Sequence, residues 1–61
     1  MKFIAFTKND GQVVVVNIAH IVAMYEVGRA TRIVISSGDD FHVEMPLAQA
    51  HAQIDDKLNP S

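Results

Sequence analysis

The chain has 61 residues, a formal net charge of -2, a hydrophobic fraction of 49% and no cysteine. Without cysteine, disulfides and thiolate metal sites are excluded, and the apolar content argues against disorder. The small negative charge gives no overall attraction to nucleic acid or to anionic membranes. No apolar run approaches the roughly 18 residues of a membrane span, and the first residues lack a signal-peptide pattern. We expect one domain over residues 1–61, located in the cytoplasm and not inserted in a membrane.

The first part of the chain predicts two strands joined by a tight turn. Residues 2–7 are rich in Phe and Ile, and residues 12–16 contain four consecutive valines. Asn9-Asp10-Gly11 lies between them, and Asp-Gly tolerates the positive φ that short hairpin turns require. Because successive side chains of a strand point to opposite faces, both faces of this hairpin are apolar.

The middle of the chain predicts three more strands. Residues 17–20 interrupt the apolar pattern and predict a short helical turn or bend, since Asn favours turns and caps. Residues 21–27, 31–36 and 40–45 then predict strands, separated by glycine-containing turns. On the last of them Phe41, Val43 and Met45 alternate with His42 and Glu44, which places the apolar three toward a core.

Pro46 changes the periodicity from that of a strand to that of a helix. Proline suits the first turn of a helix, and residues 46–58 place several side chains at helical spacing on one face. These are Leu47, Ala50, His51, Ile54 and Leu58. No capping side chain precedes Pro46, so we expect packing on the sheet to hold the helix. The predicted fold is α+β, an antiparallel meander of about five strands followed by one C-terminal helix.

The order of these signals resembles the small flagellar FlbD-like proteins. The resemblance is carried by Asn9-Asp10-Gly11, by Val-Val-Asn before Ile18 and Ile21, by the run 31–35 with Gly38, and by the final helix. It implies an accessory role in flagellar assembly or motor function, within a larger bacterial assembly. The resemblance assigns no catalytic or binding role to any individual residue.

A second resemblance covers residues 13–58. The segment 16–21, Tyr25-Glu26, the segment 31–33, Ser37-Gly38 and Leu47 are similar to the first half of LytTR-type DNA-binding domains. Those domains continue into a basic segment that contacts DNA, which has no counterpart here. The resemblance therefore implies shared strand geometry more than shared DNA binding.

The polar residues do not form a recognisable catalytic or metal-binding motif. His20, His42 and His51 have no HxH or HxxxH spacing, and a metal site needs several ligands converging on one ion. We interpret His51 as a histidine at the edge of the core, under the helix. No GxSxG elbow and no phosphate-binding glycine loop is present. We expect no enzyme, no metal and no cofactor, and an active site formed between subunits is the enzymatic alternative left open.

The apolar sheet predicts self-association. A domain of this size buries only about 60% of its unfolded surface and is marginal alone. Two apolar hairpin faces exceed what one helix can cover, so we predict a non-enzymatic interaction module that homo-oligomerises through its sheet. The predicted interface residues are Phe3, Ile4, Phe6, Val13, Val14, Val16, Val22 and Met24.

Nucleic-acid binding is the alternative function. Arg29 and Arg32 flank the central hairpin near Tyr25, and basic side chains beside an aromatic platform can hold a nucleic acid. Against this, seven acidic residues outnumber five basic ones. The competing interpretation is that the arginines pair with Glu26 or Asp40 across neighbouring strands.

Overall fold

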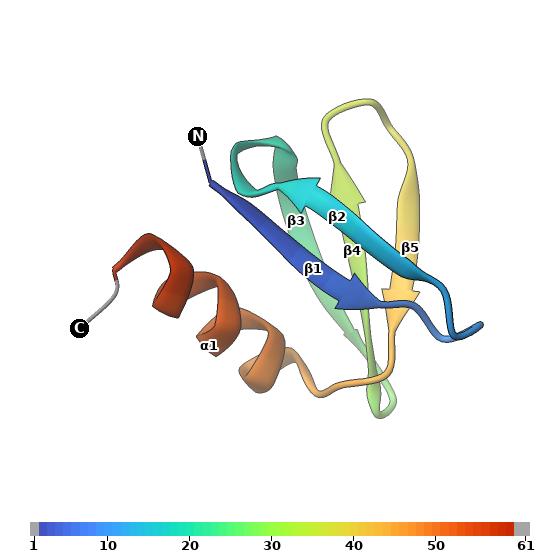
Figure 1. Cartoon of the computed structure of the whole chain (residues 1–61). Helices are drawn as coiled ribbons and strands as arrows, with labels where there is room; N and C mark the ends of the chain where they lie inside the picture. The colour runs from blue at the N-terminus through green and yellow to red at the C-terminus, as the bar shows by residue number, and fades with distance from the viewer. Residues whose placement is uncertain (1, 60–61) are drawn as a thin grey trace.

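A computed structural model describes residues 2–59 and contains two antiparallel sheets and one helix (Figure 1). The elements in chain order are β1 (Phe3–Thr7), β2 (Val13–Asn17), the 3-10 turn η1 (Ile18–His20), β3 (Ile21–Val27), β4 (Ala30–Ile35), β5 (Asp40–Val43) and α1 (Leu47–Leu58). The predicted α+β class, with five strands followed by a C-terminal helix, is confirmed, and no predicted boundary is wrong by more than two residues. Residues 1, 60 and 61 of the predicted domain lie outside the described residues.

The strands divide between two sheets, with β1 and β2 in one and β3, β4 and β5 in the other. The hairpin of β1 and β2 lies in front of the three-stranded sheet in Figure 1. The sheets join at one corner, where Lys8 bridges to Val43 and the Asn9 N–H donates to the His42 carbonyl at 3.0 Å. The two sheets thus enclose the core between them.

One face of the hairpin supplies much of that core. Ile4 pairs with Val16 and Phe6 with Val14 across the strands. Ile4, Phe6 and Val16 are buried, and Val14 is half-buried against them. Phe6 also contacts Phe41 of β5, with ring centroids 6.5 Å apart. The alternation of side chains therefore gives this hairpin one covered face and one open face.

The three-stranded sheet is organised by two local features. Gly28 has a φ of 60° in the two-residue turn between β3 and β4, the conformation that a type II′ hairpin turn requires at its first central position. A bulge between Ile21 and Ala23 shifts the register of β3 on β4. Regular alternation along residues 21–27 would place Val22 on the same face as Met24. The bulge breaks this alternation, because Val22 is 66% exposed whereas Met24 packs against the core.

Packing rather than capping holds the helix, as the sequence predicts. Pro46 makes no side-chain capping bond, but Ala50 is fully buried and Ile54 packs on the core. The buried Thr31 hydroxyl donates to the Met45 carbonyl at 2.9 Å, which ties the start of the helix to β4. His51 is exposed and so is not the predicted histidine under the helix. Its side chain lies about 100° around the helix from Ala50, beyond the narrow stripe that contacts the sheet.

Candidate oligomerisation surface

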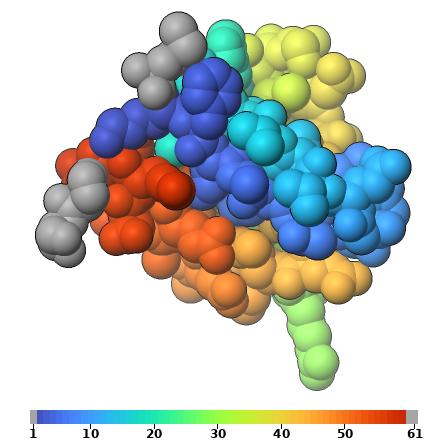
Figure 2. Space-filling model, in the orientation of Figure 1, coloured from blue at the N-terminus to red at the C-terminus, as the bar shows by residue number. Residues whose placement is uncertain are grey.

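The outer side of the hairpin is an exposed, uncharged sheet surface. Its residues, which we call the hairpin face, are Phe3, Ala5 and Thr7 of β1 and Val13, Val15 and Asn17 of β2. The register brings them together, since Ala5 lies opposite Val15 and Thr7 opposite Val13. Phe3 is 51% exposed, Val13 67% and Val15 63%. The hairpin lies toward the viewer in Figure 2, where its side chains cover the centre of the molecule.

Only part of the predicted interface lies on an accessible surface. Ile4, Phe6 and Val16 are 4%, 1% and 8% exposed, so placing them in an interface with another molecule is wrong for the folded chain. The physical reason is that the three-stranded sheet already covers this side of the hairpin. Val14 and Met24 are half-buried and pack against the same cluster.

Three predicted interface residues remain exposed, and they occupy two sheets. Phe3 and Val13 belong to the hairpin face, whereas Val22 lies on β3. The interface prediction omitted Val15 and Ala5, although strict alternation already assigns Val15 to the face of Val13 and Ala5 to the face of Phe3. We therefore take the hairpin face, which groups the larger number of exposed apolar side chains, as the candidate surface.

The candidate basic patch lies on the other side of the molecule. Tyr25 is paired with Arg32, and both are exposed, while the neighbouring Ile33 points into the core. Because neighbours on a strand point oppositely, Tyr25 and Arg32 lie on the face of the three-stranded sheet that is turned away from the hairpin. The Arg32 guanidinium is 5.9 Å from the centroid of the Tyr25 ring, which is within the range of a cation–π contact.

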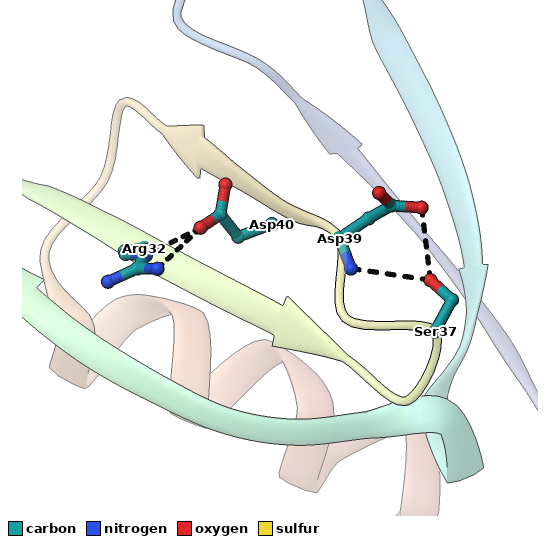
Figure 3. A network of polar contacts seen from close by, with 4 residues as sticks. All are labelled: Arg32, Ser37, Asp39 and Asp40. Carbon is teal, nitrogen blue, oxygen red and sulfur yellow. Dashed lines mark hydrogen bonds and ion pairs between the residues drawn. The ribbon is translucent and has the colours of Figure 1, made fainter.

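Arg32 already has an acidic partner. Its Nε donates to Asp40 Oδ2 at 2.9 Å, and its Nη2 contacts the same oxygen (Figure 3). Beside this pair, the Ser37 hydroxyl donates to the Asp39 carboxylate at 3.0 Å and shapes the turn that precedes β5. Asp40 thus offsets the charge of Arg32, as the competing interpretation of the sequence held. Arg29 lies in the β3–β4 turn, apart from this pair.

The histidines lie in different parts of the fold. His20 lies in η1, between β2 and β3, and its Nδ1 is 2.9 Å from the Ser36 hydroxyl. His42 lies on β5, and His51 is exposed on α1. Within residues 2–59, no group of three or more His, Cys, Asp or Glu residues lies close enough to hold a metal ion. The acidic and imidazole side chains of the described residues therefore build no ligand cluster.

An open depression of about 450 Å³ lies between the β1–β2 turn, the β3–β4 turn and the segment that follows β5. It is lined by Asn9, Val27, Arg29, Ala30 and Glu44. Its charged lining residues are one cation, Arg29, and one anion, Glu44.

The hairpin face groups exposed apolar side chains on an uncharged sheet surface, a combination that is typical of interaction sites. No helix within residues 2–59 has both the length and the hydropathy to cross a membrane. Comparison with protein-family models, curated proteins and solved structures finds no match to this chain, so the FlbD-like and LytTR-type similarities remain resemblances of pattern.

Proposed function

We propose that this chain is a non-enzymatic interaction module that assembles with copies of itself through the hairpin face. The supporting observation is that Phe3, Val13 and Val15 are each at least half exposed on one uncharged sheet surface. Large apolar side chains grouped in this way are typical of interaction sites. The setting suggested by the FlbD-like resemblance is an accessory component of a larger bacterial assembly.

The energy available from this face suits a reversible association. Fully burying a Val or Phe side chain contributes about 1.5–3 kcal/mol. Phe3, Val13 and Val15 still expose half to two-thirds of their surface, which a partner could bury. Two such faces together offer on the order of 6–10 kcal/mol. Association costs about 4 kcal/mol or more in lost freedom of motion. The hairpin face alone therefore supports a weak complex, and further contacts are needed for a tight one.

The test compares two equally exposed valines. Val15 on the hairpin face is 63% exposed and Val22 on β3 is 66% exposed. We expect the unmodified chain to increase in mass with concentration in sedimentation equilibrium, and Val15→Lys to weaken this assembly by about 10-fold or more. A lysine there is desolvated in the interface and faces a second lysine across it. Val22→Lys is the matched control and should assemble as the unmodified chain does.

Two results would count against the proposal. A chain that remains a single folded particle at millimolar concentration has no self-association to explain. Equal weakening by Val15→Lys and Val22→Lys would place the interface elsewhere or reflect a general effect of charge. The alternative function is nucleic-acid binding, and it is supported by the exposed Tyr25 ring beside Arg32. Binding of nucleic acid at low salt that is lost in an Arg29→Ala/Arg32→Ala double variant would favour it.

A further inference from the structure

The outer edge of β2 carries backbone groups that have no backbone partner within residues 2–59. In an antiparallel pair, residues that bond to the neighbouring strand alternate with residues whose N–H and C=O point outward. The Lys8 N–H donates to the Gln12 carbonyl and the Ile18 N–H to the Lys2 carbonyl. Counting inward from these two bonds, Val14 and Val16 bond to β1, and the N–H groups of Val13, Val15 and Asn17 point away from it.

Nothing in the sequence of β2 protects this edge. Natural edge strands usually carry a charge, a proline, a bulge or a covering segment that prevents pairing with another chain. The strand reads Val-Val-Val-Val-Asn and has none of the first three. Its high β propensity makes it a favourable template for a further strand.

The other edges of the fold do have such protection. The edge of β5 carries Asp40 and His42, and the His42 carbonyl accepts from the Asn9 N–H. The edge strand β3 has the bulge between Ile21 and Ala23. These are recognised ways of blocking edge pairing.

The edge of β1 is approached by the helix. The last turn of α1 lies near the residue that precedes β1, since the Lys2 ammonium donates to the Lys57 carbonyl at 2.9 Å. At its other end, Lys8 bridges to β5. Within residues 2–59, the outer edge of β2 thus has no charge, proline or bulge of its own and no neighbouring element bonded to it.

We propose that β2 pairs antiparallel with β2 of a second copy, about a twofold axis that passes beside Val15. This inference rests on the proposed function and specifies how the copies meet. The N–H and C=O of Val15 would exchange bonds with those of the partner's Val15. Each Asn17 would likewise exchange two bonds with the partner's Val13, which gives about six inter-chain backbone bonds in all. The two hairpins become one continuous four-stranded sheet.

The occupant is a second copy because the strand is complementary to itself. The edge residues are uncharged, so the twofold arrangement brings no like charges together. In the antiparallel pair, the start of each β2, which follows Asp10, lies beside the end of the partner's β2, near Ala19. The two Asp10 carboxylates are therefore kept apart. The same pairing sets Val15 beside Val15 and joins the two hairpin faces side by side into one apolar surface. The lateral contact between the two Val15 side chains buries part of each, and the backbone bonds add to the association that this contact supports.

Amide hydrogen exchange on the unmodified chain tests the pairing without any substitution. The amides of Val14 and Val16 bond within the hairpin, so we expect them to be protected at both low and high concentration. The amides of Val15 and Asn17 should exchange freely when the chain is dilute and become protected as it assembles. An assembled chain whose Val15 amide exchanges as fast as in the dilute chain would overturn the edge pairing and leave the proposed function standing.

A proline variant provides the second measurement. Val15→Pro removes an outward N–H that β1 does not use, and proline is tolerated at such edge positions. We expect it to weaken assembly by about 10-fold or more, whereas Val15→Thr, which keeps the N–H and the branched shape, should weaken it much less. Equal effects of the two substitutions on assembly would refute the edge pairing. A chain with no concentration dependence at all would instead refute the proposed function.

Discussion

The hydrogen bond from Thr31 to Met45 gives a sharp test of how the helix is held. Thr31 is fully buried on β4, and its hydroxyl donates to the Met45 carbonyl at 2.9 Å. That carbonyl lies immediately before Pro46, where α1 has no side-chain cap. The substitution Thr31→Val keeps the shape of the side chain and removes the donor.

The expected cost follows from the unpaired acceptor. Leaving a buried carbonyl unsatisfied costs about 1–3 kcal/mol. The bond to the Met45 carbonyl is part-buried, so the lower part of this range applies, and the added methyl group of valine recovers some of it. We expect a net loss of about 1–2 kcal/mol in the free energy of unfolding. For a domain of this size that loss lowers the Tm by about 4–16 °C.

The assay is thermal and urea unfolding followed by circular dichroism, at one chain concentration because self-association would shift the Tm. Thr7→Val is the matched control, measured on the dilute, unassociated chain because Thr7 is exposed on β1 and belongs to the hairpin face. It should change the stability by less than about 0.5 kcal/mol. If Thr31→Val proves as stable as the unmodified chain, the bond does not hold the helix, and the reasoning from the unpaired carbonyl is refuted.

Three further predictions concern the helix contact, the β3–β4 turn and the ion pair. Ala50→Leu should destabilise the fold by about 1–3 kcal/mol in urea unfolding, because Ala50 has no exposed surface and a larger side chain overpacks the core; Ala52→Leu on the exposed side is its control. Gly28→Ala should cost about 1–2 kcal/mol through backbone strain at φ 60° alone, since an added Cβ meets no atom within 4 Å. Gly28→Asn should cost less, and equal losses would contradict the strain argument. Arg32→Ala and Asp40→Ala, combined in a double-mutant cycle, should show a coupling of about 0.2–1 kcal/mol that decreases with salt, because the pair is exposed.

The sequence alone determined the local structure. Asp10-Gly11 and Gly28 mark turns because glycine adopts positive φ at little cost, and the structure places Gly11 and Gly28 at positive φ. The Asn17 side chain accepts from the Ala19 N–H at 3.0 Å and starts the short helical turn that asparagine predicts. Strand and helix periodicity gave the elements to within two residues.

The tertiary structure decided which apolar face is covered. Alternation assigns Val14 and Val16 to one face of the hairpin and Val13 and Val15 to the other, but both pairs are valine and look equivalent in the sequence. The three-stranded sheet packs against Val16 and leaves Val15 in solvent. The choice depends on contacts between residues far apart in the chain, together with the β3 bulge that exposes Val22, and the local pattern carries no record of either.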